Sequence, residues 1–284
     1  VDVILSLKNN MKSGLMGASR SFTRLSNSAM KFGKVGLAAT AGMTVGLAMV
    51  MREAMKLDDS LLNLAAKLNM DKTSKEFTKL EAQVRFLGRT PSFTTIQAAD
   101  MMTVLAQGGK TAKEIEKMSA AVLNLSRAMS EDAAESARVT MTVMNSFGLA
   151  AEDTGRVTDV LTHTVNNSAQ ALTDLNEAFN YVAPVARDAG LSLERTSAML
   201  AVLANNGIKG SRAGVQLRAA LLQLSTTGQA TAKALDIDLS NNDGSFRDMA
   251  KILEEFNQKT LRMTDVKKFE TYKKAFGKVG ISIV

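Results

Sequence analysis

The sequence predicts an all-α protein of many helices, arranged as hairpins or a bundle, and three observations lead to this fold class. The chain of 284 residues has 2 Pro, no Cys and no Trp, but 17 Met, a composition with few helix breakers. Apolar residues recur at steps of three and four along most of the chain. Capping residues and glycines separate these segments, so short helices that turn back on one another are expected.

The first 70 residues are expected to form their own segment, a long N-terminal helix region that is amphipathic at first and then apolar. Seven basic residues and one acidic residue lie within residues 1–52, so this region holds +6 of the net charge of +7. Any general attraction to phosphate or lipid is expected here. A heptad seam runs through it, formed by Met11, Leu15, Ala18, Phe22, Leu25, Ala29 and Phe32.

This seam predicts self-association, and a trimer is favoured. A monomer would leave the apolar stripe exposed unless it folded back on the second seam of Leu57, Leu61, Leu64 and Leu68. Ala18 and Ala29 allow close packing between copies. Phe22 and Phe32 lie on the apolar seam and not among the basic residues, so specific nucleic-acid binding is not expected.

Residues 35–51 form the most ambiguous segment. They contain no charge, lie between Lys34 and Arg52, and include the small-residue spacing of Gly42 and Gly46. A membrane span needs about 20 apolar residues and at least about 17. A helix buried in a bundle or oligomer is favoured, and the alternative is a membrane-inserting pore former or translocator.

A boundary is expected near residue 70, and residues 71–284 are expected to form a helical module of loosely repeated hairpins. Thr94 with Gln97 and Thr111 with Glu114 have capping-box spacing. Ser130 is expected to cap the next helix, which ends near Gly148, and Pro184 is expected to kink or end a later helix that stops at Gly190. A helix is expected to begin near Ser245. The last two apolar stripes are Phe246, Met249, Leu253 and Phe256, and then Val266, Phe269, Tyr272 and Phe276, of which the final one is expected to end at Gly277.

Two similar stretches, "VLAQGG" from Val104 and "VLANNG" from Val202, are predicted to be C-terminal turns of antiparallel helices. Gly or Asn accepts the left-handed conformation that such a turn requires. After the second turn, Gly214 is expected to permit close helix approach. The spacing is too irregular to predict a solenoid.

No catalytic, cofactor-binding or metal site is predicted, so the chain is not expected to be an enzyme. His163 is the only histidine and is interpreted as an ordinary helix residue. The segment from Asp236 to Gly244 is interpreted as a turn, because a calcium loop counted from Asp236 has Asn and not Gly at its sixth position and Arg247 at its twelfth. Adjacent acidic pairs such as Glu152 with Asp153 point to different helix faces.

Four pieces of the sequence carry a resemblance to a known family. They are "GRTPSFTTIQAADMMTVLAQGG", "SFGLAAEDTGRVTDVL", "AGLSLERTSAMLAVLANNGIKGSRAGVQLRAALLQL" and "DGSFRDMAKILEEF" followed by "KKAFGKVG". In this order they resemble the core region of phage tail tape measure proteins, over roughly Leu57 to Gly280. The piece "NNGIKGSRAGVQLR" is the most specific.

The resemblance implies a few copies of a long protein inside the tail tube of the virion, assembled in the host cytoplasm. It implies roles in tail assembly and tail length, and departure from the tail ahead of the DNA. Implied partners are tail tube proteins, tail tip or baseplate hub proteins, assembly chaperones and the host inner membrane during ejection. Since a ruler needs a continuous helix of about 1.5 Å per residue, the short helices of residues 71–284 predict a packed module instead.

Overall fold

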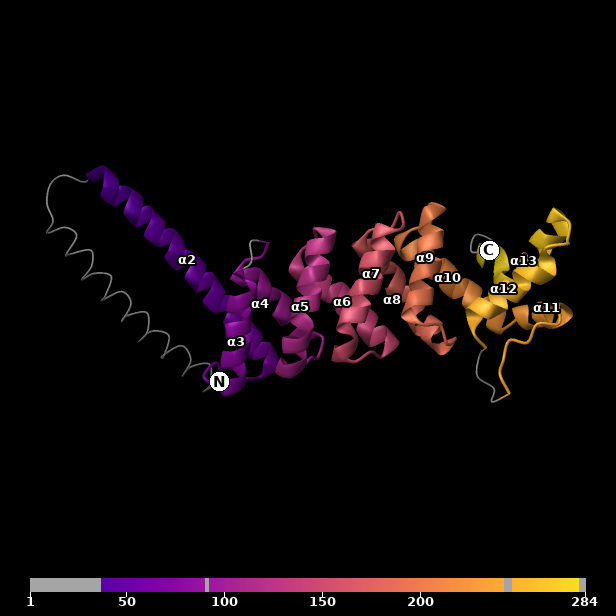
Figure 1. Ribbon diagram of the computed structural model, residues 1–284, viewed down its shortest axis with the longest axis horizontal. Coiled ribbons are helices and arrows are strands. Elements are labelled where there is room, and N and C mark those ends of the chain that lie inside the picture. Colours follow the sequence, from indigo (N-terminus) through magenta and orange to yellow (C-terminus); the bar gives the residue numbers. More distant parts are fainter. Residues whose placement is uncertain (1–36, 90–91, 243–246, 281–284) are drawn as a thin grey trace. The chain divides into compact units, whose positions relative to one another are not determined.

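The computed structural model describes residues 37–89, 92–242 and 247–280, and these residues form helices joined by short connections (Figure 1). The helices are α2 (Leu37–Leu68), α3 (Lys75–Leu87), α4 (Thr95–Gln107), α5 (Ala112–Met129), α6 (Ala133–Phe147), the 3-10 helix η1 (Ala151–Asp153), α7 (Thr154–Asn166), α8 (Leu172–Asp188), α9 (Leu193–Asn205), α10 (Gly210–Ser225), α11 (Gly228–Ala234), α12 (Met249–Thr260) and α13 (Asp265–Gly280). The all-α fold class is confirmed for this part of the chain.

The chain divides into two units, Val1–Met55 and Lys56–Val284, and the division falls within α2. In the second unit, the end of α2 buries Leu57, Leu61 and Leu64. The separate segment expected for residues 1–70 and the module expected for residues 71–284 stay predictions.

Helices of the second unit pack in two rows. In one, which we call the α4–α10 row, α4 packs on α6, α6 on α8 and α8 on α10. In the other, the α3–α9 row, α3 packs on α5, α5 on α7 and α7 on α9. Consecutive helices also contact one another across the rows, so each helical hairpin packs against the next along the chain (Figure 1). This nearest-neighbour packing is typical of helical repeat proteins.

Helix starts follow the capping chemistry of the sequence. Thr94 with Gln97 and Thr111 with Glu114 both form complete capping boxes, as predicted. Glycines in the left-handed conformation follow the helix ends: φ is +84° at Gly109. At Gly207 it is +80°. The two similar stretches are therefore helix C-terminal turns, one after α4 and the other after α9.

One local prediction about helix ends was wrong. Ser130 does not cap α6; it ends α5 with a φ of 54°, and the Asp132 side chain accepts the hydrogen bonds at the start of α6. Pro184 was expected to kink or end a helix, and it does not end α8, which continues to Asp188. Since Pro184 and Asn180 are both exposed, water can hydrogen-bond the Asn180 carbonyl that a proline leaves without a helical partner.

The C-terminal helices pack through aromatic rings. Phe256 of α12 and Phe276 of α13 meet edge to face with their ring centroids 5.0 Å apart, and Tyr272 is also buried. Val266 and Phe269 were expected on the same stripe, but they are 74% and 52% exposed. They lie near the start of α13, where the other packed helices do not cover this side.

The last expectations concern the boundaries of these helices. α12 begins at Met249, not near Ser245, and Phe246 lies outside the described residues. Gly277 interrupts the helical geometry of α13 with a φ of 76° and a ψ of 177°, which confirms it as the break.

Residues 37–51 of the ambiguous segment are helical and belong to α2. In the described ranges of the chain, none of the helices combines the length and the apolar character that crossing a membrane requires.

Candidate helix-packing site

Two neighbouring helices of the α4–α10 row approach each other closely at the contact of α8 with α10, within the stretch "NNGIKGSRAGVQLR". A Cβ atom added to Gly214 would lie 2.3 Å from the Ala178 carbonyl oxygen and 2.8 Å from the Ala178 Cα. These distances are too short for any side chain, so only glycine allows the two backbones to meet here. The predicted role of Gly214 is confirmed, and Leu217, Leu221 and Leu224 are buried beside it.

A carboxylate of α8 caps the start of α10. Lys209 occupies the N-cap position of α10 but makes no side-chain capping bond. The Ser211 backbone N–H instead donates to Glu177 Oε2 at 3.3 Å, and a negative charge at a helix N-terminus is favourable. Gly210 has a φ of +58°, and a Cβ there would lie 2.9 Å from the same oxygen. Sequence patterns gave no signal for this cap, because its donor and acceptor lie 34 residues apart.

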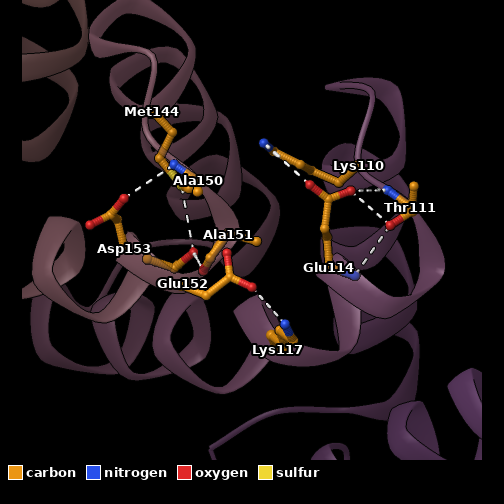
Figure 2. A network of polar contacts seen from close by, with 10 residues as sticks. Lys110, Thr111, Glu114, Lys117, Met144, Ala150, Ala151, Glu152 and Asp153 are labelled. Carbon is orange, nitrogen blue, oxygen red and sulfur yellow. Dashed lines mark hydrogen bonds and ion pairs between the residues drawn. The ribbon is translucent and has the colours of Figure 1, made fainter.

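Polar contacts connect the starts of successive helices in the α3–α9 row. Figure 2 shows the start of α5, where Glu114 Oε2 accepts hydrogen bonds from the Thr111 N–H at 2.8 Å and from its hydroxyl at 2.7 Å. One turn further along, Lys117 Nζ donates to Glu152 Oε1 of η1 at 2.6 Å. This ion pair joins the start of one hairpin to the start of the next.

The same kind of contact recurs along the row. Arg156 Nη1 of α7 donates to Glu194 Oε1 of α9 at 2.6 Å, and Arg195 of α9 pairs with Asp248. Arg247, which lies just before α12, forms a two-bond pair with Glu255 of that helix. Because these side chains are exposed or partly exposed, the pairs contribute little to stability and mainly favour one register between hairpins.

These contacts shift the pKa values of the groups involved. The hydrogen bond from the Thr111 backbone holds the pKa of Glu114 below its ordinary value of 4.5. The hydrogen bond from Lys117 lowers the pKa of Glu152, and the same bond raises the pKa of Lys117. All three groups therefore stay charged near neutral pH.

The structure places the other candidate residues as follows. The heptad seam of residues 11–32 lies outside the described residues, so its role in self-association stays a prediction. Gly42 and Gly46 lie within α2. His163 is exposed on α7, and its carbonyl accepts a hydrogen bond from Asn167. Across the described ranges, no three His, Cys, Asp or Glu side chains gather in an arrangement that could hold a metal ion.

The fold and this site define an all-α protein of stacked helical hairpins. Residues 81–277 match the family described as "Phage-related minor tail protein". A "Tape measure protein" of Pneumococcus phage Dp-1 is 36% identical over 163 residues, which are 57% of this chain and 14% of that protein. A "Probable tape measure protein" of Escherichia phage P2 is 32% identical over 224 residues, 78% of this chain and 27% of that protein. No solved structure matches.

The family match covers more than half of the chain, and the chain belongs to the phage minor tail and tape measure protein family. It is a component of the phage tail. The matched regions span 14% and 27% of the two relatives' lengths, so most of each relative lies outside the compared region.

Proposed function

We propose that this chain is a structural segment of a tail tape measure protein and has no enzymatic role. The observation that carries the proposal is the match of residues 81–277 to the minor tail protein family, together with relatives that are named tape measure proteins. In this proposal the whole protein lies inside the tail tube, organises tail assembly and tail length, and leaves the tail ahead of the DNA.

Within that protein, the segment acts as a folded module and not as a measuring rod. A continuous α-helix advances about 1.5 Å per residue, whereas packed helices lie about 8–10 Å apart. The pair α5 and α6 spans residues 112–147, which would extend about 54 Å as one helix but adds only about 10 Å as a packed hairpin. Stacked hairpins therefore suit a structural platform better than a ruler.

The proposed partners follow from this role. Several copies, with a trimer favoured, associate through the seam of residues 11–32, and assembly chaperones bind the protein before the tail tube covers it. The module contacts tail tube, tail tip or baseplate hub proteins, and the protein meets the host inner membrane during ejection. Specific nucleic-acid binding is not part of the proposal.

Deleting residues 71–284 from the full-length protein in the phage tests the proposed function. Electron microscopy of the resulting lysates is expected to show missing or malformed tails, because the module organises an early step of assembly. A phage with a silent recoding of the same region serves as the control. Normal tails of normal length in the deletion phage would contradict the proposal.

A further inference from the structure

The exposed side of α10 carries a stripe of arginines and apolar residues in alternation. The stripe consists of Arg212, Val215, Arg218 and Leu222, which we call the α10 stripe. All four are exposed, and their spacing places them on one side of the helix. Val215 exposes 48% of its surface and Leu222 exposes 43%. The opposite side of α10 is the one that packs on α8 and α13.

Tyr181 of α8 is a further exposed residue near the contact of α8 with α10. Glu177 of α8 meets Ser211 at the start of α10, and Ala178 meets Gly214. Tyr181 follows Glu177 by one turn on the same side of α8, and it exposes 44% of its surface.

The two arginines of the stripe differ from the arginines that join neighbouring helices. Arg156, Arg195 and Arg247 each pair with a carboxylate. In the part of the chain that the structure describes, Arg212 and Arg218 form no ion pair. Two uncompensated guanidinium groups therefore flank exposed apolar side chains.

Helices α4 and α6 of the α4–α10 row lack this combination. The exposed positions of α4 include Asp100 and Gln107, and those of α6 include Arg138 and Asn145. Arg138 pairs with Glu135 of its own helix, and the large exposed apolar residues in the described ranges include none from α4 or α6. The α10 stripe is therefore not a general consequence of hairpin stacking.

We propose that the α10 stripe is a docking surface for an acidic amphipathic helix of another protein. Arg212 and Arg218 lie six positions apart, about 9 Å along the helix axis, so a helix lying along α10 meets them with two carboxylates about two turns apart. Its apolar residues cover Val215, Leu222 and the ring of Tyr181. Guanidinium groups suit this role because they form two-bond pairs with carboxylates.

Burial and charge both favour a protein helix as the occupant. Val215 and Leu222 expose 48% and 43% of their surfaces, and a helix lying along α10 covers these exposed apolar parts. A nucleic acid would pair with the arginines but would leave the apolar residues exposed to water. An acidic amphipathic helix pairs with the two arginines and also covers Val215 and Leu222.

The test uses the whole chain and a designed helical peptide without Tyr or Trp. The peptide carries a leucine stripe flanked by glutamates, and a second peptide has lysines in place of the glutamates. The chain has no Trp and two Tyr, of which Tyr181 is exposed and Tyr272 is buried. A change in tyrosine fluorescence therefore reports binding near Tyr181. A Tyr181→Phe variant, which should lose this change, shows that it comes from Tyr181 and not from Tyr272.

The first variant combines Arg212→Glu with Arg218→Glu, and its matched control combines Lys79→Glu with Arg89→Glu. The control makes the same change in net charge at exposed positions in and after α3, a helix outside the α8–α10 contact. The first variant is expected to weaken binding of the acidic peptide at least about tenfold and to gain binding of the basic peptide. The control is expected to change both affinities less than about threefold.

Equal affinity of the two double variants for the acidic peptide would overturn the proposal. Two other results would also overturn it. If the Arg212→Glu/Arg218→Glu variant loses only its binding to phosphatidylglycerol vesicles, the stripe binds a lipid surface. If this variant loses only its concentration-dependent self-association in sedimentation experiments, the stripe binds a second copy of the chain.

Discussion

Replacing Gly214 with alanine tests the close contact between α8 and α10. The added Cβ would lie 2.3 Å from the Ala178 carbonyl oxygen, whereas ordinary van der Waals contact begins near 3.4 Å. The obstructing atoms belong to the backbone, so no side chain can rotate away. The two helices must separate by about 1 Å to accept the methyl group, and such a gap forfeits about a quarter to a half of each dispersion contact across it.

Two opposing effects set the size of the change. Overpacking of this kind costs about 1–3 kcal/mol. Alanine is favoured over glycine within a helix by about 1 kcal/mol, which offsets part of that cost. We therefore expect Gly214→Ala to lower the free energy of unfolding by up to about 2 kcal/mol.

Gly155 of α7 provides the matched control. A Cβ at Gly155 would meet nothing within 4 Å, so Gly155→Ala is expected to raise stability by about 0.5–1 kcal/mol. Urea unfolding of both variants, followed by far-UV circular dichroism, gives the two midpoints. A Gly214→Ala midpoint equal to or above that of the unchanged chain, measured beside a stabilised Gly155→Ala, would refute the close-contact argument.

Three further predictions address the caps, the ion pairs and the N-terminal seam. The folded state lowers the pKa of Glu114 below 4.5, so the stabilising contribution of this carboxylate is complete above the unfolded pKa and is lost as the pH falls through the folded pKa. Glu114→Gln removes this contribution, whereas the control Glu116→Gln keeps it. The urea midpoint of Glu114→Gln should therefore fall less on acidification below about pH 4.5 than that of Glu116→Gln. Lys117 and Glu152 are exposed, so a double-mutant cycle with Lys117→Met and Glu152→Gln should give only a weak coupling that decreases with added salt. A coupling that does not change with salt would contradict the interpretation as a surface pair. Phe22→Asp with Leu25→Asp should convert the oligomer of the whole chain to monomers in analytical ultracentrifugation, whereas a monomeric unchanged chain would refute self-association.

Local chemistry made most helix boundaries predictable from the sequence. Thr94 and Thr111 form the predicted capping boxes because both partners of each box lie within one turn. Gly109 and Gly207 adopt the predicted left-handed conformation because the chain reverses immediately after a helix. Ser130 was misassigned since serine can occupy either a helix end or a helix start, and Asp132 competes for the start of α6.

Contacts between distant residues were not predictable in the same way. Periodicity showed that Val266, Phe269 and Tyr272 share a helix face, but it could not show that the packed helices cover only the last of these. The two-row stack was not predicted because successive hairpins share their three-dimensional geometry but not their amino-acid sequence. Gly214 was recognisable as a close-approach residue, whereas its partner on α8 was identified only by the structure.

Tail length in phages with an altered hairpin tests the central claim most directly. One phage lacks residues 112–147, which form α5 and α6, and another carries them twice; electron microscopy measures the tails of both. A folded module predicts that the duplication leaves tail length unchanged, and that the deletion either leaves it unchanged or prevents assembly. Tails that shorten and lengthen by about 54 Å, the length of these residues at about 1.5 Å each, would contradict the account, because this segment would then be part of the ruler.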